Sequence, residues 1–94
     1  MKINDIAHKH WAWIEKVGWH NKSELEYLAL IASEVGELIQ ACRLIQSQAK
    51  RADEVADILL RVMDFAVMQG IDIEAALKTK MKLNAERGTR GRLK

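Results

Sequence analysis

The sequence predicts an all-α, four-helix bundle-like protein that assembles into an oligomer. The 94 residues contain no proline and no glycine-rich stretch, so few residues are left for long loops. Apolar residues recur with helical spacing along most of the chain. Hydrophobic residues make up 49% of the sequence, although a chain of this size buries only about 60–65% of its surface alone. This surplus favours helix faces that pair between copies.

The first two helices are bounded by clear signals. Apolar spacing predicts a first helix over residues 3–17, and Gly18 offers its C-terminal stop. Ser23 and Glu26 form an S-x-x-E capping box, which predicts the start of a second helix over residues 24–45.

The last two helices follow a polar turn at residues 46–48. The third helix is expected over residues 49–69 and ends at Gly70. Asp72 can cap a fourth helix over residues 73–87. We expect residues 1–94 to form a single domain, with a basic tail at about 88–94.

The central helices carry apolar stripes that predict the core. The main stripe of the second helix is Leu25, Leu28, Ala32, Val35, Ile39 and Cys42. The stripe of the third helix is Ala52, Val55, Ala56, Leu59, Val62, Met63 and Ala66. Cys42, the single cysteine, is therefore interpreted as a small core residue. One cysteine allows no intrachain disulfide, which fits a reducing cytoplasm.

Two acidic pairs lie within these otherwise apolar segments. Glu34 and Glu37 are three residues apart, as are Glu54 and Asp57, so each pair projects from one helix face. In an antiparallel hairpin the pairs are level if the turn is centred near residues 45–46, a little before the turn signals. Four converging carboxylates would repel one another without a cation, and such oxygen ligands suit Mg²⁺ or Mn²⁺. The alternative is that both pairs are solvated helix faces.

The fourth helix adds cationic and amide groups. Its stripe begins with apolar residues and continues as Lys80, Asn84 and Arg87. These side chains can bind phosphate oxygens. Metal-loaded carboxylates beside them would form a coherent site for hydrolysing a phosphoanhydride.

Aromatic residues and histidines suggest further candidates. Trp19 and His20 lie in the connector before the acidic helix, where an aromatic ring can stack on a nucleobase or simply plug the helix junction. His10 lies on the apolar stripe of the first helix. We interpret His10 as a hydrogen-bonded core or interface residue rather than a metal ligand.

Charge and hydropathy bear on partners and location. The formal net charge is only +2, but Arg87, Arg90, Arg92 and Lys94 crowd the C-terminal end. We interpret this tail as solvated and expect no nucleic-acid partner. The sequence has no signal-peptide core and no apolar run near the ~18 residues of a membrane span, so we expect a cytoplasmic protein.

The order of these motifs resembles the MazG-like branch of the all-α nucleoside triphosphate pyrophosphohydrolases. The resemblance covers about residues 19–87. The matching segments are Glu34-Val35-Gly36-Glu37-Leu38, Asp53-Glu54-Val55-Ala56-Asp57-Ile58-Leu59, Gly70-Ile71-Asp72-Ile73-Glu74-Ala75-Ala76 and Lys80-Met81-Lys82-Leu83-Asn84-Ala85-Glu86-Arg87. Ser33 stands where the family often has another acidic residue.

The resemblance implies cleavage of a (d)NTP between its α and β phosphates, giving the monophosphate and pyrophosphate and removing surplus nucleotides. It implies Mg²⁺ bound by the carboxylates of Glu34, Glu37, Glu54 and Asp57, with Lys80, Asn84 and Arg87 on the phosphate side. It also implies dimers or dimers of dimers with sites between chains. The alternatives are a phosphoribosyl-ATP pyrophosphohydrolase and a non-catalytic helical module that binds a partner through its basic tail.

Overall fold

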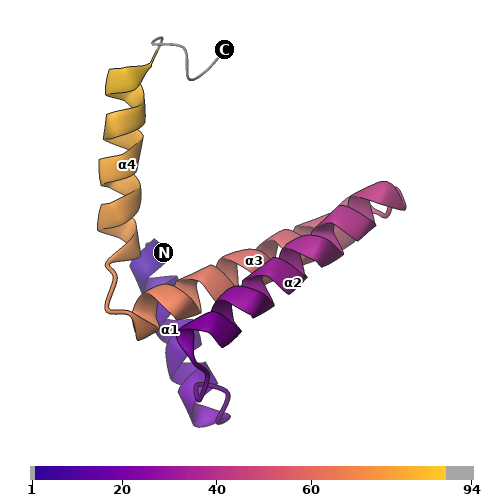
Figure 1. Ribbon diagram of the computed structural model, residues 1–94, viewed down its shortest axis with the longest axis horizontal. Helices are drawn as coiled ribbons and strands as arrows, with labels where there is room; N and C mark the ends of the chain where they lie inside the picture. Colours follow the sequence, from indigo (N-terminus) through magenta and orange to yellow (C-terminus); the bar gives the residue numbers. More distant parts are fainter. Residues whose placement is uncertain (1, 89–94) are drawn as a thin grey trace.

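The computed structural model describes residues 2–88, and four α-helices account for most of them (Figure 1). Their bounds are Ile3–Lys16 for α1, Glu24–Arg43 for α2, Gln48–Met68 for α3 and Ile73–Arg87 for α4. The four predicted helices are confirmed. Of the predicted basic tail, all but Gly88 lies outside the described residues.

Local side-chain chemistry fixes where the helices begin. The Ser23 hydroxyl accepts from the Glu26 backbone N–H at 3.2 Å, and the Glu26 carboxylate accepts from the Ser23 N–H at 2.8 Å. The predicted capping box is therefore confirmed. Ser47 caps α3 and Asp72 caps α4 in the same way, each accepting a backbone N–H three residues on. The N–H donated to Asp72 lowers the pKa of that carboxyl.

Three helices, α1, α2 and α3, end one or two residues earlier than predicted, whereas α4 ends at Arg87 as predicted. Gly18 and Gly70 adopt φ angles of +79° and +69°, a left-handed conformation that ends α1 and α3 at little steric cost. At the end of α2 this conformation falls on Ile45, whose φ is +52°. The α2–α3 connector therefore spans residues 44–47 and is centred between residues 45 and 46.

A β-branched side chain is unfavourable at positive φ, and Ile45 is also 82% exposed. Ile45→Asn should raise the free energy of unfolding by about 1 kcal/mol, because Asn tolerates this conformation better. Chemical denaturation measures the change. Leu44→Asn is the matched control, since Leu44 is exposed at a negative φ. Equal effects at both positions would show that hydrophobic exposure, not backbone strain, controls stability here.

The core lies where α1 and α2 pack against α3. α2 and α3 form an antiparallel hairpin, and α1 crosses α3 (Figure 1). The buried apolar residues are Ala7, Ile14, Tyr27, Ala41, Met63 and Ala66. Two acidic residues, Glu54 and Asp64, are buried among them.

α4 stands apart from the α2–α3 hairpin (Figure 1). It packs mainly against α1, and none of its residues is buried. Asn4 of α1 holds its beginning, donating to the Asp72 carboxylate at 2.8 Å and accepting from the Glu74 backbone N–H at 3.1 Å. A four-helix bundle is therefore not closed within one chain.

The predicted apolar stripes were only partly right. Cys42 is exposed rather than in the core, because the whole main stripe of α2 faces away from α3. We call its large side chains, Leu25, Leu28, Val35 and Ile39, the apolar face of α2; they are 39–77% exposed. On α3, Met63 and Ala66 are buried as predicted, whereas Val55 and Leu59 are 44% and 50% exposed.

The molecule is extended for its size. Its radius of gyration is 15.6 Å, whereas a compact chain of this length would have about 12–13 Å. Among the helices described, none is long and apolar enough to cross a membrane.

Candidate metal and nucleotide site

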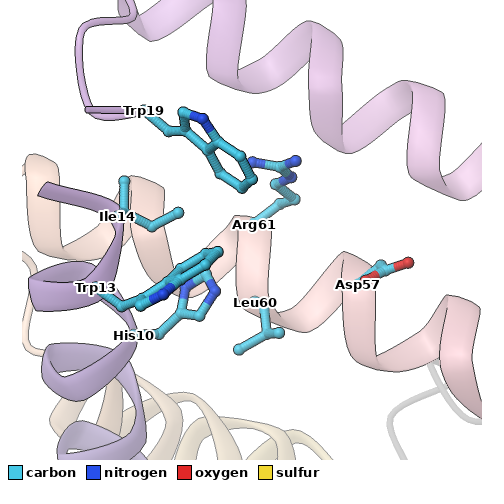
Figure 2. Close-up of a pocket in the computed structure, with 7 residues that line it drawn as sticks. All are labelled: His10, Trp13, Ile14, Trp19, Asp57, Leu60 and Arg61. Atoms are coloured by element: carbon cyan, nitrogen blue, oxygen red, sulfur yellow. The ribbon is translucent and has the colours of Figure 1, made fainter. Parts of the chain in front are cut away.

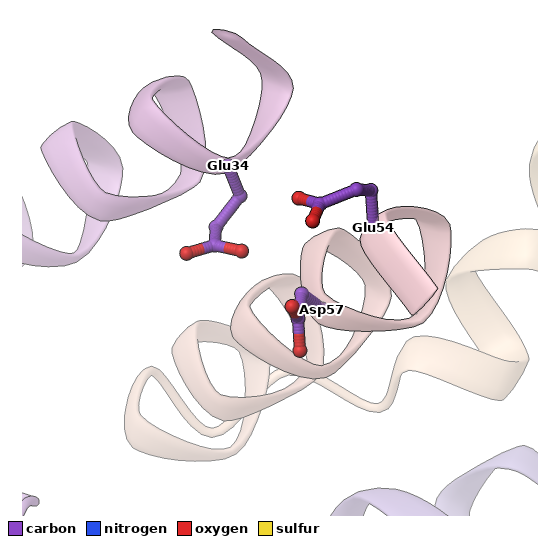
Figure 3. A group of neighbouring side chains, drawn as sticks. All are labelled: Glu34, Glu54 and Asp57. Atoms are coloured by element: carbon purple, nitrogen blue, oxygen red, sulfur yellow. The ribbon is translucent and has the colours of Figure 1, made fainter. Parts of the chain in front are cut away.

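Three carboxylates converge between α2 and α3. Glu34 on α2 and Glu54 and Asp57 on α3 each offer an oxygen, and these oxygens lie within 4.8 Å of one another. Figure 3 shows Glu34 pointing across the gap toward Asp57 and Glu54. Because the connector is centred between residues 45 and 46, positions 34 and 57 are level, which explains the convergence. We call these three residues the carboxylate triad.

The triad carries more negative charge than its surroundings balance. Glu54 is only 3% exposed; one of its oxygens accepts from the Lys50 ammonium at 2.9 Å. Its other oxygen is buried and has no hydrogen-bond partner within residues 2–88. Burial, followed by the charges of Glu37 and Asp57, raises the pKa of Glu34. An unpaired buried oxygen and crowded carboxylates are the features that a bound divalent cation would relieve.

Glu37 lies beside the triad rather than within it. It lines a cavity of about 170 Å³ together with Glu54, Lys50, Gln40, Ala41 and Gln46. The four predicted carboxylates therefore occupy one region of the hairpin. Three of them have oxygens within 4.8 Å of one another, and the fourth, Glu37, lines a cavity together with Glu54. Lys50, which sequence reasoning did not single out, forms an ion pair with Glu54, four residues further along α3.

The predicted phosphate-binding residues are not brought to the triad within one chain. Lys80, Asn84 and Arg87 are all exposed on α4. Because Asn4 and Asp72 direct α4 away from the hairpin, its outer turns project into solvent (Figure 1).

The predicted aromatic candidates differ in position. Trp19 lines a cavity of about 220 Å³ between α1 and α3, which we call the aromatic cavity (Figure 2). Its lining is His10, Trp13, Ile14, Trp19, Asp57, Leu60 and Arg61. Asp57 belongs to both the triad and this lining, so the two features adjoin. His20 is half-buried and is not part of the lining, and its Nδ1 atom is buried without a partner among the described residues.

Sequence reasoning missed part of this environment. Arg61, one turn after Asp57 on α3, lines the aromatic cavity. Asp64 is fully buried and pairs with His10, whose Nδ1 lies 2.7 Å from the Asp64 carboxylate. The signal for Asp64 was available, since an acidic residue between Met63 and Phe65 interrupts an apolar run. The expectation that His10 is hydrogen-bonded is confirmed, although its side chain is half-buried rather than in the core.

The fold and the site define an all-helical protein with an acidic centre between two antiparallel helices. Residues 22–89 match the family model described as the MazG nucleotide pyrophosphohydrolase domain, and the chain belongs to this family. The matched region contains all three triad residues, Glu37 and the α4 residues.

A curated relative supports the same assignment. The dATP/dGTP diphosphohydrolase of Cyanophage S-2L is 35% identical over 60 residues, which cover 64% of this chain and 52% of the relative. The chain thus spans about half the length of that relative. No solved structure matches the chain significantly.

Proposed function

We propose that the protein is a nucleotide pyrophosphohydrolase that cleaves (d)NTP between the α and β phosphates, giving (d)NMP and pyrophosphate. The carboxylate triad within the matched family region is the observation that carries this proposal. The name of the cyanophage relative places dATP and dGTP among the substrates to be tested first. We expect the reaction to remove surplus nucleotides in the cytoplasm.

The triad would hold the metal ion on which MazG proteins depend in general. Its hard oxygen donors and the unpaired Glu54 oxygen fit Mg²⁺, with Mn²⁺ as a substitute. When bound, the ion would neutralise charge on the phosphate oxygens. Lys50, which is half exposed, would then be free to face the same phosphates.

Glu37 would handle a proton in this reaction. As the carboxylate beside the triad, it would accept a proton from the attacking water while the other three hold metal. Glu37→Gln should therefore leave the fold and metal binding nearly intact and reduce kcat by about 100-fold or more. Steady-state kinetics with dATP and circular dichroism test both parts. Full turnover in a folded Glu37→Gln protein would show that Glu37 does not accept the proton.

Lys80, Asn84 and Arg87 would act on the triphosphate of a neighbouring chain. They are exposed on a helix that stands off from its own triad, and the apolar face of α2 is also uncovered. Pairing between copies would cover that face and could bring α4 of one chain to the triad of another. We therefore propose a dimer or a dimer of dimers.

Trp19 would supply a wall for the nucleobase. The aromatic cavity adjoins the triad through Asp57, so a triphosphate on the metal can place its base there. Trp13 and Trp19 meet edge to face with ring centroids 5.2 Å apart. His20, which lies next to Trp19 in sequence, would support this connector rather than contact the base.

The experiment that tests the function is pyrophosphate release from a panel of ribo- and deoxyribonucleoside triphosphates, with Mg²⁺ and with EDTA. We expect metal-dependent release with the monophosphate as co-product. Release of inorganic phosphate alone would overturn the cleavage position. Turnover of phosphoribosyl-ATP without turnover of the panel would identify the protein as a phosphoribosyl-ATP pyrophosphohydrolase. No turnover of either would favour the non-catalytic helical module.

A further inference from the structure

The aromatic cavity has a built polar element in its wall. Asp64 is fully buried on α3, and its only hydrogen-bond partner among the described residues is the His10 Nδ1 atom of α1, at 2.7 Å. Burial raises the pKa of Asp64, while the hydrogen bond and charge of His10 and the charge of Arg61 oppose that shift. A buried carboxylate is costly, so its use to orient one histidine calls for an explanation beyond packing.

The other side of the His10 ring is available to a ligand. His10 retains 22% side-chain exposure and lines both the aromatic cavity and an adjoining cavity of about 350 Å³. Trp13 and Leu60 line both cavities as well. His10 is therefore the histidine that a base stacked beside Trp13 would meet (Figure 2).

The hydrogen bond to Asp64 determines what His10 can offer. An ionised carboxylate only accepts hydrogen bonds, so the Nδ1 atom of a neutral His10 carries the proton. The Nε2 atom then has a free lone pair and acts as an acceptor. An amino N–H on the edge of a nucleobase can donate a hydrogen bond to Nε2. A keto oxygen at the same place is itself an acceptor, so it faces Nε2 without a hydrogen bond between them.

We propose that His10, oriented by Asp64, is a specificity residue that accepts a hydrogen bond from the amino group of the nucleobase. This inference rests on the proposed function for its substrate class. It selects adenine over hypoxanthine and cytosine over uracil. Asp64 is a positioning residue that acts through His10.

The test compares kcat/KM for dATP against dITP and for dCTP against dUTP. For the wild type we expect amino-bearing bases to be favoured by about tenfold, the scale of one hydrogen bond. His10→Phe, which keeps a ring without nitrogen, should bring both ratios close to one. His8→Phe and Asp5→Asn are the matched controls, because both residues are exposed on α1, and both variants should keep the wild-type ratios.

Asp64→Asn provides a second, independent variant. Its amide can donate to Nδ1, which moves the ring proton to Nε2 and converts the acceptor into a donor. The ratios should then fall to one or invert in favour of dITP and dUTP. A purely structural role for the pair would lower activity with all four substrates equally and leave the ratios unchanged, which would overturn the proposal.

A binding measurement separates this inference from the proposed function. Deoxyadenosine and deoxyinosine can be titrated without metal while NMR follows the indole N–H signals of Trp13 and Trp19. Preferential shifts with deoxyadenosine that disappear in His10→Phe would support the inference even if no triphosphate is hydrolysed. Equal shifts with both nucleosides, or none with either, would overturn it even if hydrolysis is observed.

Discussion

Glu54→Gln should abolish metal-dependent turnover while leaving the protein folded. Glu54 supplies the most buried carboxylate of the triad, and its second oxygen has no partner among the described residues. The amide is nearly isosteric but carries no charge, so it is a poor ligand for Mg²⁺. Residues that merely support metal ligands typically cost 10–100-fold when changed, so loss of a ligand should cost about 100-fold or more in kcat/KM.

The same variant should separate metal binding from folding. Without metal, removing one of three crowded carboxylates relieves repulsion, and Lys50, the ion-pair partner of Glu54, is half exposed and can turn to solvent, so the melting temperature should stay equal or rise. With Mg²⁺ or Mn²⁺ added, the wild type should be stabilised by mass action, whereas Glu54→Gln should gain little. Differential scanning fluorimetry across a metal titration measures both effects.

The chain contains a matched control for this substitution. Glu74 also pairs with a lysine four residues away, Lys78, at 3.4 Å, but it lies on α4 outside the triad. Glu74→Gln should therefore leave both turnover and the metal-induced shift unchanged. If Glu54→Gln behaves like Glu74→Gln, the triad does not hold the metal.

The triad could be anticipated from the sequence because helix geometry is local. The spacing of Glu54 and Asp57 fixes their common face, and the antiparallel register follows from the position of one turn. The turn signals at residues 46–48 predicted a small offset. The structure places the connector at residues 44–47, because α2 ends at Arg43 and Ser47 caps α3. This removes the offset at Glu34 and Asp57.

The packing faces were harder to anticipate than the helices. α2 is apolar on two sides, and periodicity does not say which side meets α3. The sequence favoured the stripe containing Val35 and Ile39, but the structure buries Tyr27 and Ala41 instead. The side that carries Glu34 packs within the chain. The more hydrophobic side of α2 stays exposed in the single chain. What covers it depends on a partner, and the sequence of one chain does not specify that partner.

The path of α4 was likewise not accessible from periodicity. Its capping residue Asp72 was correctly identified, but the Asn4 side chain that binds Asp72 lies 68 positions away in sequence. That long-range contact ties the beginning of α4 to the beginning of α1, and α4 then stands apart from the hairpin (Figure 1). Lys80 and Asn84 could therefore be recognised as phosphate-binding candidates without knowing which triad they would serve.

Ile39→Asp should convert an oligomer into a monomer and suppress turnover. Ile39 is 54% exposed on the apolar face of α2, which is too hydrophobic to remain solvated at low cost in an extended chain of this size. A charge buried at the centre of a helix–helix interface is strongly unfavourable, so association should weaken by about 100-fold or more. Sedimentation velocity or light scattering measures the assembly state.

The loss of turnover is the more informative half of this prediction. If α4 of one chain serves the triad of another, the Ile39→Asp monomer keeps its own triad and its Mg²⁺ shift but lacks Lys80, Asn84 and Arg87 at the phosphates. Mixing it with a Glu54→Gln chain should not restore activity, because the interface is lost. By contrast, a Lys80→Ala chain has an intact interface, and mixing it with Glu54→Gln should restore part of the activity. One site of the mixed assembly then combines the intact triad of the Lys80→Ala chain with the intact Lys80 of the Glu54→Gln chain.

The control for the interface is Ile71→Asp. Ile71 is 45% exposed in the α3–α4 connector and does not belong to the apolar face, so the same substitution there should preserve assembly and turnover. A wild-type protein that is monomeric and fully active would contradict both the interface and the shared site. In that case α4 would have to swing back onto its own hairpin, and crosslinking Lys80 to Glu37 within one chain would detect that movement.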